Sequence, residues 1–220
     1  MIPTINLANS LTAGQQGVAV PLVPATWDSA SKTANITLSN GDLTAASDAG
    51  STYEAVKSNR NNINTDNGGK FYWEVLVDSA TGGDLYVGLI ESTVSLVSNT
   101  WFTTQGGDYL AWRNNGSHFR SGWVDGANSN VSYTTGDVLM FAIDIPAGKF
   151  WHGLNGTWDS AGDPAAGTTE QFNTMPSSTD FAFIMSTDNN GGANQLTLRS
   201  DPDDFTESVP SGFTPGFAES

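Results

Sequence analysis

The carboxylates that fall within predicted strands are the first residues of this sequence that could do chemistry. Glycoside hydrolases use two carboxylates that flank the scissile bond, roughly 5–10 Å apart. An E-x-D-x-x-E run would supply such a pair, because alternate residues of a strand share a face. No such run occurs: Glu74 is an isolated acid within its strand, and Asp78 and Asp144 come at strand ends. We therefore expect all three acids to be structural.

The other catalytic sets are also incomplete. The chain has no cysteine, and His118 and His152 are its two histidines. The sequence contains no G-x-S-x-G, H-E-x-x-H or G-x-x-x-x-G-K motif, and two histidines cannot form a three-histidine zinc site. His152 follows Trp151 on a predicted strand, where we interpret it as flanking the core. The sequence thus predicts no catalytic residue and a protein that is not an enzyme.

Two acidic loops leave calcium open as a cofactor. They read Asp188-Asn189-Asn190-Gly191 and Asp201-Pro202-Asp203-Asp204. Their oxygen atoms suit a hard cation, but neither loop matches the EF-hand pattern, and turn formation by Asp and Asn explains them equally well. Calcium bound by Asp188, Asp201, Asp203 and Asp204 is one interpretation, and acids that form turns are the other. No other cofactor is expected.

The middle of the chain, residues 94–135, is rich in aromatic residues and suggests recognition. Rigid aromatic and arginine side chains offer contact area at low entropy cost, and sugar rings stack on Trp and Tyr faces. However, seven tryptophans in one domain must mostly fill its core, and we expect Trp73 and Trp151 there. Core and surface therefore remain alternatives for the middle set. The candidate ligand-binding residues are Trp101, Tyr109, Trp112, Arg113, His118, Arg120, Trp123 and Trp158.

Composition and charge limit the partners. The formal net charge of the 220 residues is −15, which disfavours phosphate contacts with nucleic acid and binding to anionic membranes. The first 20 residues carry no Lys or Arg, so we expect no signal peptide. No apolar run is long enough to cross a membrane. Helix formers are scarce, whereas Thr, Asn, Gly and aromatic residues are common, which favours an all-β fold.

The elements that must position these residues are short strands separated by tight turns. The strongest are 70–78 and 85–91, which we predict to pair as a hairpin, and a second hairpin formed by 138–144 and 149–152. Five Asn-Gly pairs punctuate the chain, as in a sandwich of short strands. Further strands are predicted at 35–38, 53–58, 181–185 and 195–199. We expect an irregular N-terminal arm over residues 1–25 and one all-β domain over 26–220.

Several segments resemble the SPRY domain in order and spacing. They are Gly69-Lys70-Phe71-Tyr72-Trp73-Glu74-Val75, Val87-Gly88-Leu89, Gly136-Asp137-Val138, Lys149-Phe150-Trp151 with Asn155-Gly156, and Ser211-Gly212-Phe213. Each motif alone is common, but their order and spacing together are specific, and the resemblance runs from about Thr26 to Phe213. The resemblance implies an antiparallel two-sheet β-sandwich of the concanavalin A-like type, built for binding rather than chemistry. It also implies a binding rim formed by loops, for which residues 98–125 and 155–167 are the equivalents by position.

Residues 33–41, 155–158 and 162–167 resemble the SPRY domains of bacteriophage structural proteins. This resemblance implies a particle-borne module in a fibre, a tail or a head decoration, displaying loops toward a host-surface receptor or glycan. The arm would then contact other virion proteins. A purely structural capsid or fibre subunit without a ligand is the alternative, and a carbohydrate-active enzyme is a weaker one. A homo-oligomer is compatible with this role, although no coiled-coil heptad supports it.

Overall fold

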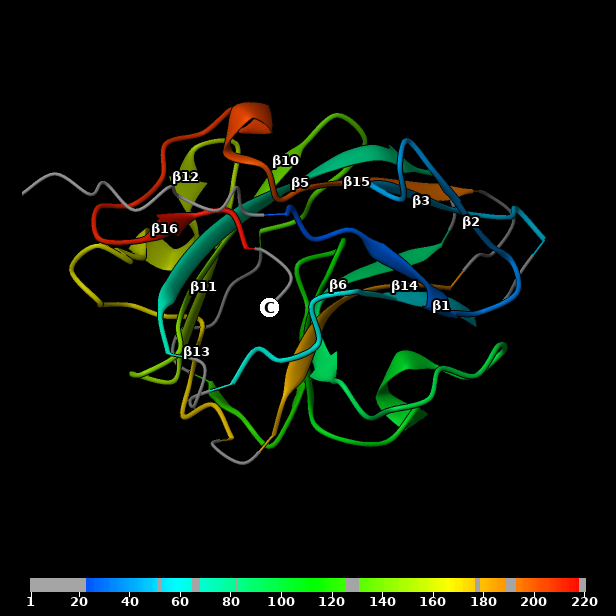
Figure 1. Cartoon of the computed structure of the whole chain (residues 1–220), viewed down its shortest axis with the longest axis horizontal. Helices are drawn as coiled ribbons and strands as arrows, with labels where there is room; N and C mark the ends of the chain where they lie inside the picture. The colour runs from blue at the N-terminus through cyan, green and yellow to red at the C-terminus, as the bar shows by residue number, and fades with distance from the viewer. Residues whose placement is uncertain are drawn as a thin grey trace, which may run out of the picture.

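A computed structural model describes residues 23–50, 53–64, 68–81, 83–125, 131–176, 179–188 and 193–217. Within these ranges the chain forms two β-sheets that face each other, and nearly all strand pairs are antiparallel (Figure 1). The helical elements of this part are three short 3-10 turns: η1 (Phe102–Thr104), η2 (Asp159–Ala161) and η3 (Pro202–Asp204). The predicted all-β, two-sheet fold class is confirmed.

The first sheet has six strands. In spatial order they are β1 (Trp27–Lys32), β4 (Tyr53–Ser58), β14 (Phe181–Asp188), β6 (Asp84–Glu91), β7 (Tyr109–Arg113) and β8 (His118–Ser121). β7 and β8 form a hairpin within the segment that the sequence presents as less regular. This segment therefore supplies one edge of the sheet.

The second sheet has ten strands. Eight follow one path: β2 (Ile36–Ser39), β3 (Thr44–Ser47), β15 (Asn194–Arg199), β5 (Lys70–Ala80), β10 (Val138–Asp144), β11 (Lys149–Leu154), β13 (Phe172–Asn173) and β9 (Val124–Asp125). β12 (Thr157–Trp158) pairs with β11, and β16 (Thr214–Pro215) pairs in parallel with β5. The predicted hairpin of β10 and β11 is confirmed, with partners from Leu139↔Leu154 to Asp144↔Lys149.

The predicted hairpin between 70–78 and 85–91 is wrong. β5 pairs with β10 and β15 in the ten-stranded sheet, whereas β6 pairs with β14 and β7 in the six-stranded sheet. Both strands are buried along most of their length, so each needs a central place with a partner on both sides. The chain between Ala80 and Asp84 therefore connects two sheets instead of reversing within one.

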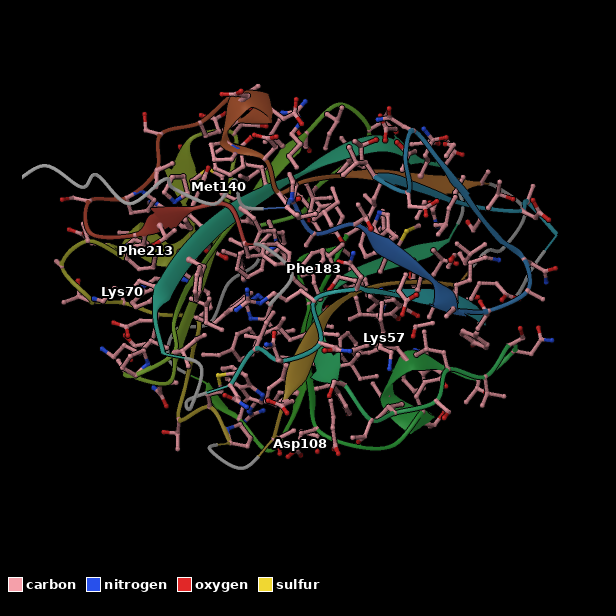
Figure 2. All side chains as sticks on the ribbon, in the orientation of Figure 1. Lys57, Lys70, Asp108, Met140, Phe183 and Phe213 are labelled. Atoms are coloured by element: carbon pink, nitrogen blue, oxygen red, sulfur yellow. The ribbon has the colours of Figure 1, made fainter. Side chains whose placement is uncertain are left out.

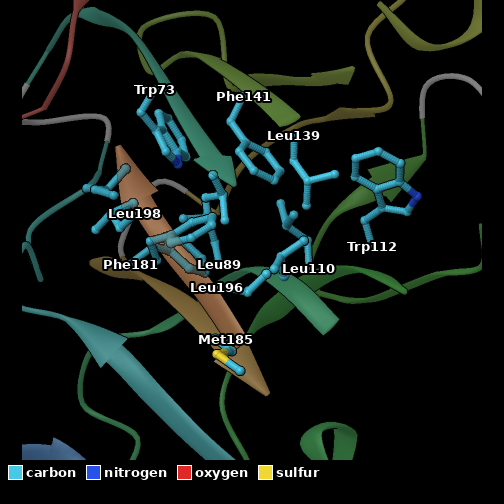
Figure 3. Close-up of a cluster of buried hydrophobic side chains, with 14 of the residues drawn as sticks. Trp73, Leu89, Leu110, Trp112, Leu139, Phe141, Phe181, Met185, Leu196 and Leu198 are labelled. Atoms are coloured by element: carbon cyan, nitrogen blue, oxygen red, sulfur yellow. The ribbon is translucent and has the colours of Figure 1, made fainter. Parts of the chain in front are cut away.

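The main core lies between the two sheets and is dense in aromatic rings. Trp73 of β5 stacks on Phe141 of β10 at a centroid distance of 5.5 Å and meets Phe183 of β14 edge-on at 5.6 Å. Figure 3 shows Trp73, Phe141 and Leu139 from one sheet close to Leu89 and Leu110 from the other. Burial of these large side chains is the main force that holds the sheets together.

Each sheet also carries a second apolar layer on its outer face. On the six-stranded sheet, Tyr86 and Ile90 are covered by a loop that places Phe102 against them. On the ten-stranded sheet, Tyr72 and Trp151 are covered by the chain after β15, including Phe213. Trp73 and Trp151 are both fully buried, as predicted, but Trp151 belongs to this outer layer and not to the core between the sheets.

Gly88 in the centre of the six-stranded sheet has no room for a side chain. A Cβ at Gly88 would lie 2.9 Å from the Ala111 Cα of β7 and would also overlap the Leu110 backbone. We expect Gly88→Ala to lower the free energy of unfolding by about 1–3 kcal/mol through overpacking, measured by urea denaturation. Gly50→Ala is the matched control, because a Cβ there meets nothing within 4 Å. Equal stability of the two variants would contradict the prediction.

Residues 1–22 of the predicted arm lie outside the described residues, so the arm stays a prediction. The folded body begins at Ala25, whose N–H donates to the Phe217 carbonyl at 3.2 Å and whose carbonyl accepts from Ser200 Oγ at 2.6 Å. In the ranges that the structure covers, no helix combines the length and hydrophobicity needed to span a bilayer.

Candidate functional site

The structure separates the eight predicted ligand-binding residues. Trp112 and Trp123 are 1% and 4% exposed, so they are core residues and not part of a surface. The reason for Trp112 is the alternation along β7: Leu110 and Trp112 point into the core, and Tyr109 and Ala111 point outward. The expected surface loses these two residues.

Tyr109 and Arg113 lie on the outer face of the six-stranded sheet but are engaged there. Tyr109 packs edge-on against Phe102 at 5.0 Å. Arg113 pairs with Asp84 and lies over the Tyr86 ring, 5.9 Å from its centroid. These contacts within the chain make both residues part of a packed platform on this outer face.

Arg120 and Trp158 lie apart from that platform. Arg120 is exposed, and its Nε donates to the Trp123 carbonyl at 2.9 Å. Trp158 lies in the outer layer of the other sheet, where it meets Tyr72 edge-on at 6.1 Å. The two segments predicted as one rim therefore do not meet: Trp101 and Tyr109 of 98–125 lie on the outer face of one sheet, and Trp158 of 155–167 lies on that of the other.

Trp101 is the member of the set whose ring is open to solvent, with 39% exposure. It belongs to residues 92–105, which we call the outer loop (Figure 1, green). Large exposed hydrophobic residues of the described part are Val23, Val97 and Trp101, and two of these three lie on the outer loop. The loop therefore presents an aliphatic and an aromatic side chain to the outside.

The outer loop is held to β4 by hydrogen bonds along its length. Lys57 Nζ donates to the Ser92 and Val94 carbonyls at 2.6 and 2.7 Å, and Figure 2 labels Lys57 beside the loop. Farther along, Glu54 accepts from Ser98 Oγ at 3.2 Å. Burial lowers the pKa of Lys57, and the charge of Asp28 opposes this shift. A loop held in this way at its start and at its middle is a preorganised surface.

The Trp101 ring is also fixed in orientation. Its Nε1–H donates to Tyr86 Oη at 3.3 Å, and its ring meets Phe119 edge-on at 6.2 Å. Tyr86 in turn donates to Asp84 at 3.1 Å, and burial is the main cause that raises its pKa to about 12. The Tyr86 hydroxyl therefore stays protonated at neutral pH and can serve as both acceptor and donor.

A cavity of about 340 Å³ lies beside the start of the outer loop. Its walls come from β1, from Lys57 of β4 and from the loop, through Ala30, Ser31, Lys32, Lys57, Ser92, Thr93, Val94, Ser95 and Leu96. Hydroxyl, ammonium and backbone groups predominate in this lining. Such a lining suits a ligand rich in hydroxyl groups rather than an apolar one.

The four acids of the predicted calcium site are not gathered into one cluster of metal ligands among the described residues. Asp188 ends β14, and residues 189–192 of its loop lie outside the described ranges. Asp201 caps η3 by accepting from the Asp203 N–H at 3.0 Å, and Asp203 and Asp204 are exposed. This capping explains Asp201 as a turn residue, and calcium binding stays a prediction.

Sequence reasoning missed one constellation completely. His118 points inward from β8, and its Nε2 lies 2.8 Å from Nε2 of His152 on β11. On the other side of the His152 ring, Nδ1 faces Asp159 Oδ2 at 3.5 Å. His152, which the sequence predicted to flank the core, is fully buried, and burial followed by the His118 charge lowers its pKa well below the usual value. The alternation in β8 could have placed His118 and Phe119 on opposite faces, but no sequence signal singles out Asp159.

The outer loop and the exposed Trp101 are the candidate binding site, and comparisons with known proteins bear on its scaffold. No protein-family model and no curated protein significantly matches the sequence. The SPRY domain of human HERC1 is similar in structure, with a TM-score of 0.57 and 14% identity, over 79% of this chain and 96% of that chain. A stonustoxin structure gives a TM-score of 0.48 and 15% identity, over 80% of this chain and 27% of that chain. The protein therefore has a SPRY-like β-sandwich fold.

Proposed function

We propose that this protein is a non-enzymatic binding module of a bacteriophage particle that recognises a host-surface glycan through the outer loop. The observation that carries the proposal is the exposed Trp101 ring, held in place on the outer loop, whose first residues line a polar cavity. The SPRY-like sandwich supplies a rigid scaffold for such a loop. A fold alone does not define a function, so we assign glycan recognition to the outer loop and not to the sandwich as such.

A glycan fits this surface better than a flat apolar partner does. A sugar ring has an apolar C–H face, which stacks on an exposed aromatic ring, and hydroxyl groups, which need donors and acceptors. Trp101 offers the aromatic ring for stacking. The cavity, lined by Ser92, Thr93 and Ser95, offers the hydrogen-bond donors and acceptors. The net charge of −15 repels acidic saccharides at long range, so we propose a neutral glycan.

The particle location rests on the resemblance of residues 33–41, 155–158 and 162–167 to phage SPRY domains. In this proposal residues 1–25 contact other virion proteins, while the outer loop faces away from the particle.

A role without catalysis is supported by the contacts of two strand carboxylates, Glu74 and Asp144. Glu74 is fully buried and accepts hydrogen bonds from Tyr72, Thr206 and Glu207. Asp144 pairs with Lys70 at 2.8 Å. Both carboxylates are thus committed to structure, which supports the proposal of a binder.

Trp101→Ala is expected to weaken glycan binding by about tenfold or more, the loss typical of an anchoring aromatic residue. The protein stability should change by no more than about 1 kcal/mol, because the ring is partly exposed and makes one hydrogen bond. The measurement is a glycan array of neutral bacterial surface saccharides, followed by calorimetric titration of the best binder with both proteins.

Trp158→Ala is the matched control, since Trp158 is a partly exposed tryptophan on the other outer face. It should leave glycan affinity unchanged. If the unmodified protein binds no glycan, the proposal is wrong and a purely structural subunit remains. If Trp158→Ala is as harmful as Trp101→Ala, the outer loop is not the binding surface.

A further inference from the structure

A second site with its own chemistry lies between the sheets, where His118, His152 and Asp159 meet. The three residues come from β8, β11 and η2, and one ligand atom from each lies within 4.8 Å of the others. The two imidazole Nε2 atoms are 2.8 Å apart. Two nitrogen atoms from different sheets thus point at one another, beside a buried carboxylate.

The surroundings fix His152 firmly. Its ring stacks on Trp112 with centroids 4.1 Å apart and 17° between the planes. Its backbone N–H donates to Gln171 Oε1 at 2.9 Å, and the Gln171 amide also donates to the Asp159 carbonyl at 3.0 Å. Gln171 therefore fixes the position of β11, which carries His152, relative to η2, which carries Asp159.

The buried charge of Asp159 has little compensation within the described part of the chain. Asp159 is 4% exposed, and its Oδ1 accepts from Ser160 Oγ at 3.0 Å. Its Oδ2 has no hydrogen-bond partner among the described residues and faces Nδ1 of His152 at 3.5 Å. Buried carboxylates need a nearby positive charge or several donors. The following residues, Ser160 and Ala161, have φ angles of 52° and 58°, a costly backbone conformation for residues other than glycine.

We propose that His118 and His152 bind a first-row transition-metal dication such as Zn²⁺ through their Nε2 atoms, with Asp159 as an outer carboxylate. In metal sites a carboxylate commonly accepts from the other nitrogen of a ligating histidine, which fixes the ring and leaves the ligand nitrogen unprotonated. Nδ1 of His152 faces Asp159 in this way. The metal charge would then balance the buried carboxylate through the His152 ring.

The geometry admits such an ion after a small adjustment. With metal–nitrogen bonds of about 2.0–2.1 Å, two nitrogen atoms at a tetrahedral angle stand roughly 3.3–3.4 Å apart. The two Nε2 atoms, 2.8 Å apart, must therefore separate by about half an ångström. A small shift of β8, an edge strand of its sheet, allows this. Asp159 cannot share the ion with Nε2, because it lies on the Nδ1 side of the ring. In this proposal water molecules fill the remaining coordination positions of the ion. They reach it from the side of His118, which is partly exposed.

The chemistry of the ligands separates this site from the predicted calcium loops. Imidazole nitrogen suits zinc, copper, nickel and cobalt, whereas calcium and magnesium prefer oxygen ligands. The site should therefore discriminate strongly between Zn²⁺ and Ca²⁺.

The experiment titrates chelator-treated full-length protein with Zn²⁺ and, separately, Ca²⁺ by calorimetry, and records the visible absorption of Co²⁺ as a probe of nitrogen coordination. We expect one equivalent of Zn²⁺, a Co²⁺ spectrum with nitrogen ligands, and a rise in Tm with added zinc. His118→Ala should abolish all three. Asp159→Asn should weaken zinc binding by about 10–100-fold, the usual effect of removing an outer-sphere partner.

Asp163→Asn is the matched control, because Asp163 lies in a nearby surface turn where it accepts from the Ala166 N–H. It should bind zinc like the unmodified protein. His118→Gln is a milder variant, which replaces His118→Ala if that protein fails to fold. Absence of zinc binding by the unmodified protein, or equal binding by the His118 variants, would overturn the proposal and leave a hydrogen bond between the two imidazoles. None of the three readouts, the calorimetric titration, the Co²⁺ spectrum and the Tm, involves a glycan, so this test is independent of the proposed glycan binding.

Discussion

Replacement of Glu74 by glutamine is expected to lower the free energy of unfolding by about 3–5 kcal/mol, the cost of breaking a buried charged network. Glu74 is fully buried in β5. Oε1 accepts from Tyr72 Oη and the Glu207 N–H, both at 2.8 Å. Oε2 accepts from the N–H of Thr206 at 2.9 Å and from its hydroxyl at 3.0 Å.

Glutamine has the same shape as glutamate, but it exchanges one acceptor oxygen for an NH₂ donor. That donor would face N–H and O–H groups that themselves need an acceptor, and buried groups without partners are costly. The ion pair with Arg199, at 3.5 Å, would also be lost. Because the donors from Thr206 and Glu207 lie in the chain after β15, we expect this segment to detach from the outer face of the ten-stranded sheet.

Urea denaturation measures the stability change, and limited proteolysis near residues 200–217 measures the detachment. Glu207→Gln is the control: it is the same substitution close by, but Glu207 reaches Glu74 through its backbone N–H. The control should remain within about 0.5 kcal/mol of the unmodified protein. A Glu74→Gln protein as stable as this control would refute the role assigned to the buried carboxylate.

Trp112→Ala is the second change with a large expected effect, about 3–5 kcal/mol of destabilisation, the cost of truncating a buried tryptophan. Figure 3 shows Trp112 beside Leu139 at one end of the core cluster. Its ring packs between His152 at 4.1 Å and Tyr133 at 4.8 Å. Its Nε1–H donates to the Val131 carbonyl at 2.9 Å. The variant loses this packing and this hydrogen bond and leaves a cavity.

Trp101→Ala supplies the comparison, because it is the same substitution on the outer loop and should cost about 1 kcal/mol or less. Trp112→Phe separates the two contributions at the buried position, since it keeps an aromatic ring but loses the hydrogen bond. It should fall between the unmodified protein and Trp112→Ala in thermal unfolding. A Trp112→Ala protein that unfolds together with Trp101→Ala would show that Trp112 is not a core residue.

Local patterns predicted the elements well where turn chemistry and alternation agree. The β10–β11 hairpin is one such case. The turn after the first predicted strand is another, because Asn40 and Gly41 adopt φ angles of 54° and 63°, the left-handed conformation that Gly and Asn favour. The same signals failed for β5 and β6, since a strong strand followed by another strong strand does not say whether the chain reverses within a sheet or crosses to a second one.

The candidate site was only partly predictable for a related reason. Alternation along a strand tells which residues share a face, but not which face another layer will cover. Trp101 and Trp112 both belong to the aromatic middle of the sequence, and only the packing shows that one is exposed and the other is 1% exposed. The anchoring of the outer loop by Lys57 depends on a contact across 35 to 37 residues, which no local pattern contains.

By itself, the sequence determined the all-β class, the resemblance to the SPRY fold and the burial of Trp73 and Trp151, because these follow from strand propensity, turn residues and large apolar side chains. Only the tertiary structure decided which sheet each strand joins, that both outer faces are covered, and that His118, His152 and Asp159 meet. The physical reason is distance along the chain: these contacts form between two sheets whose strands come from separate parts of the sequence.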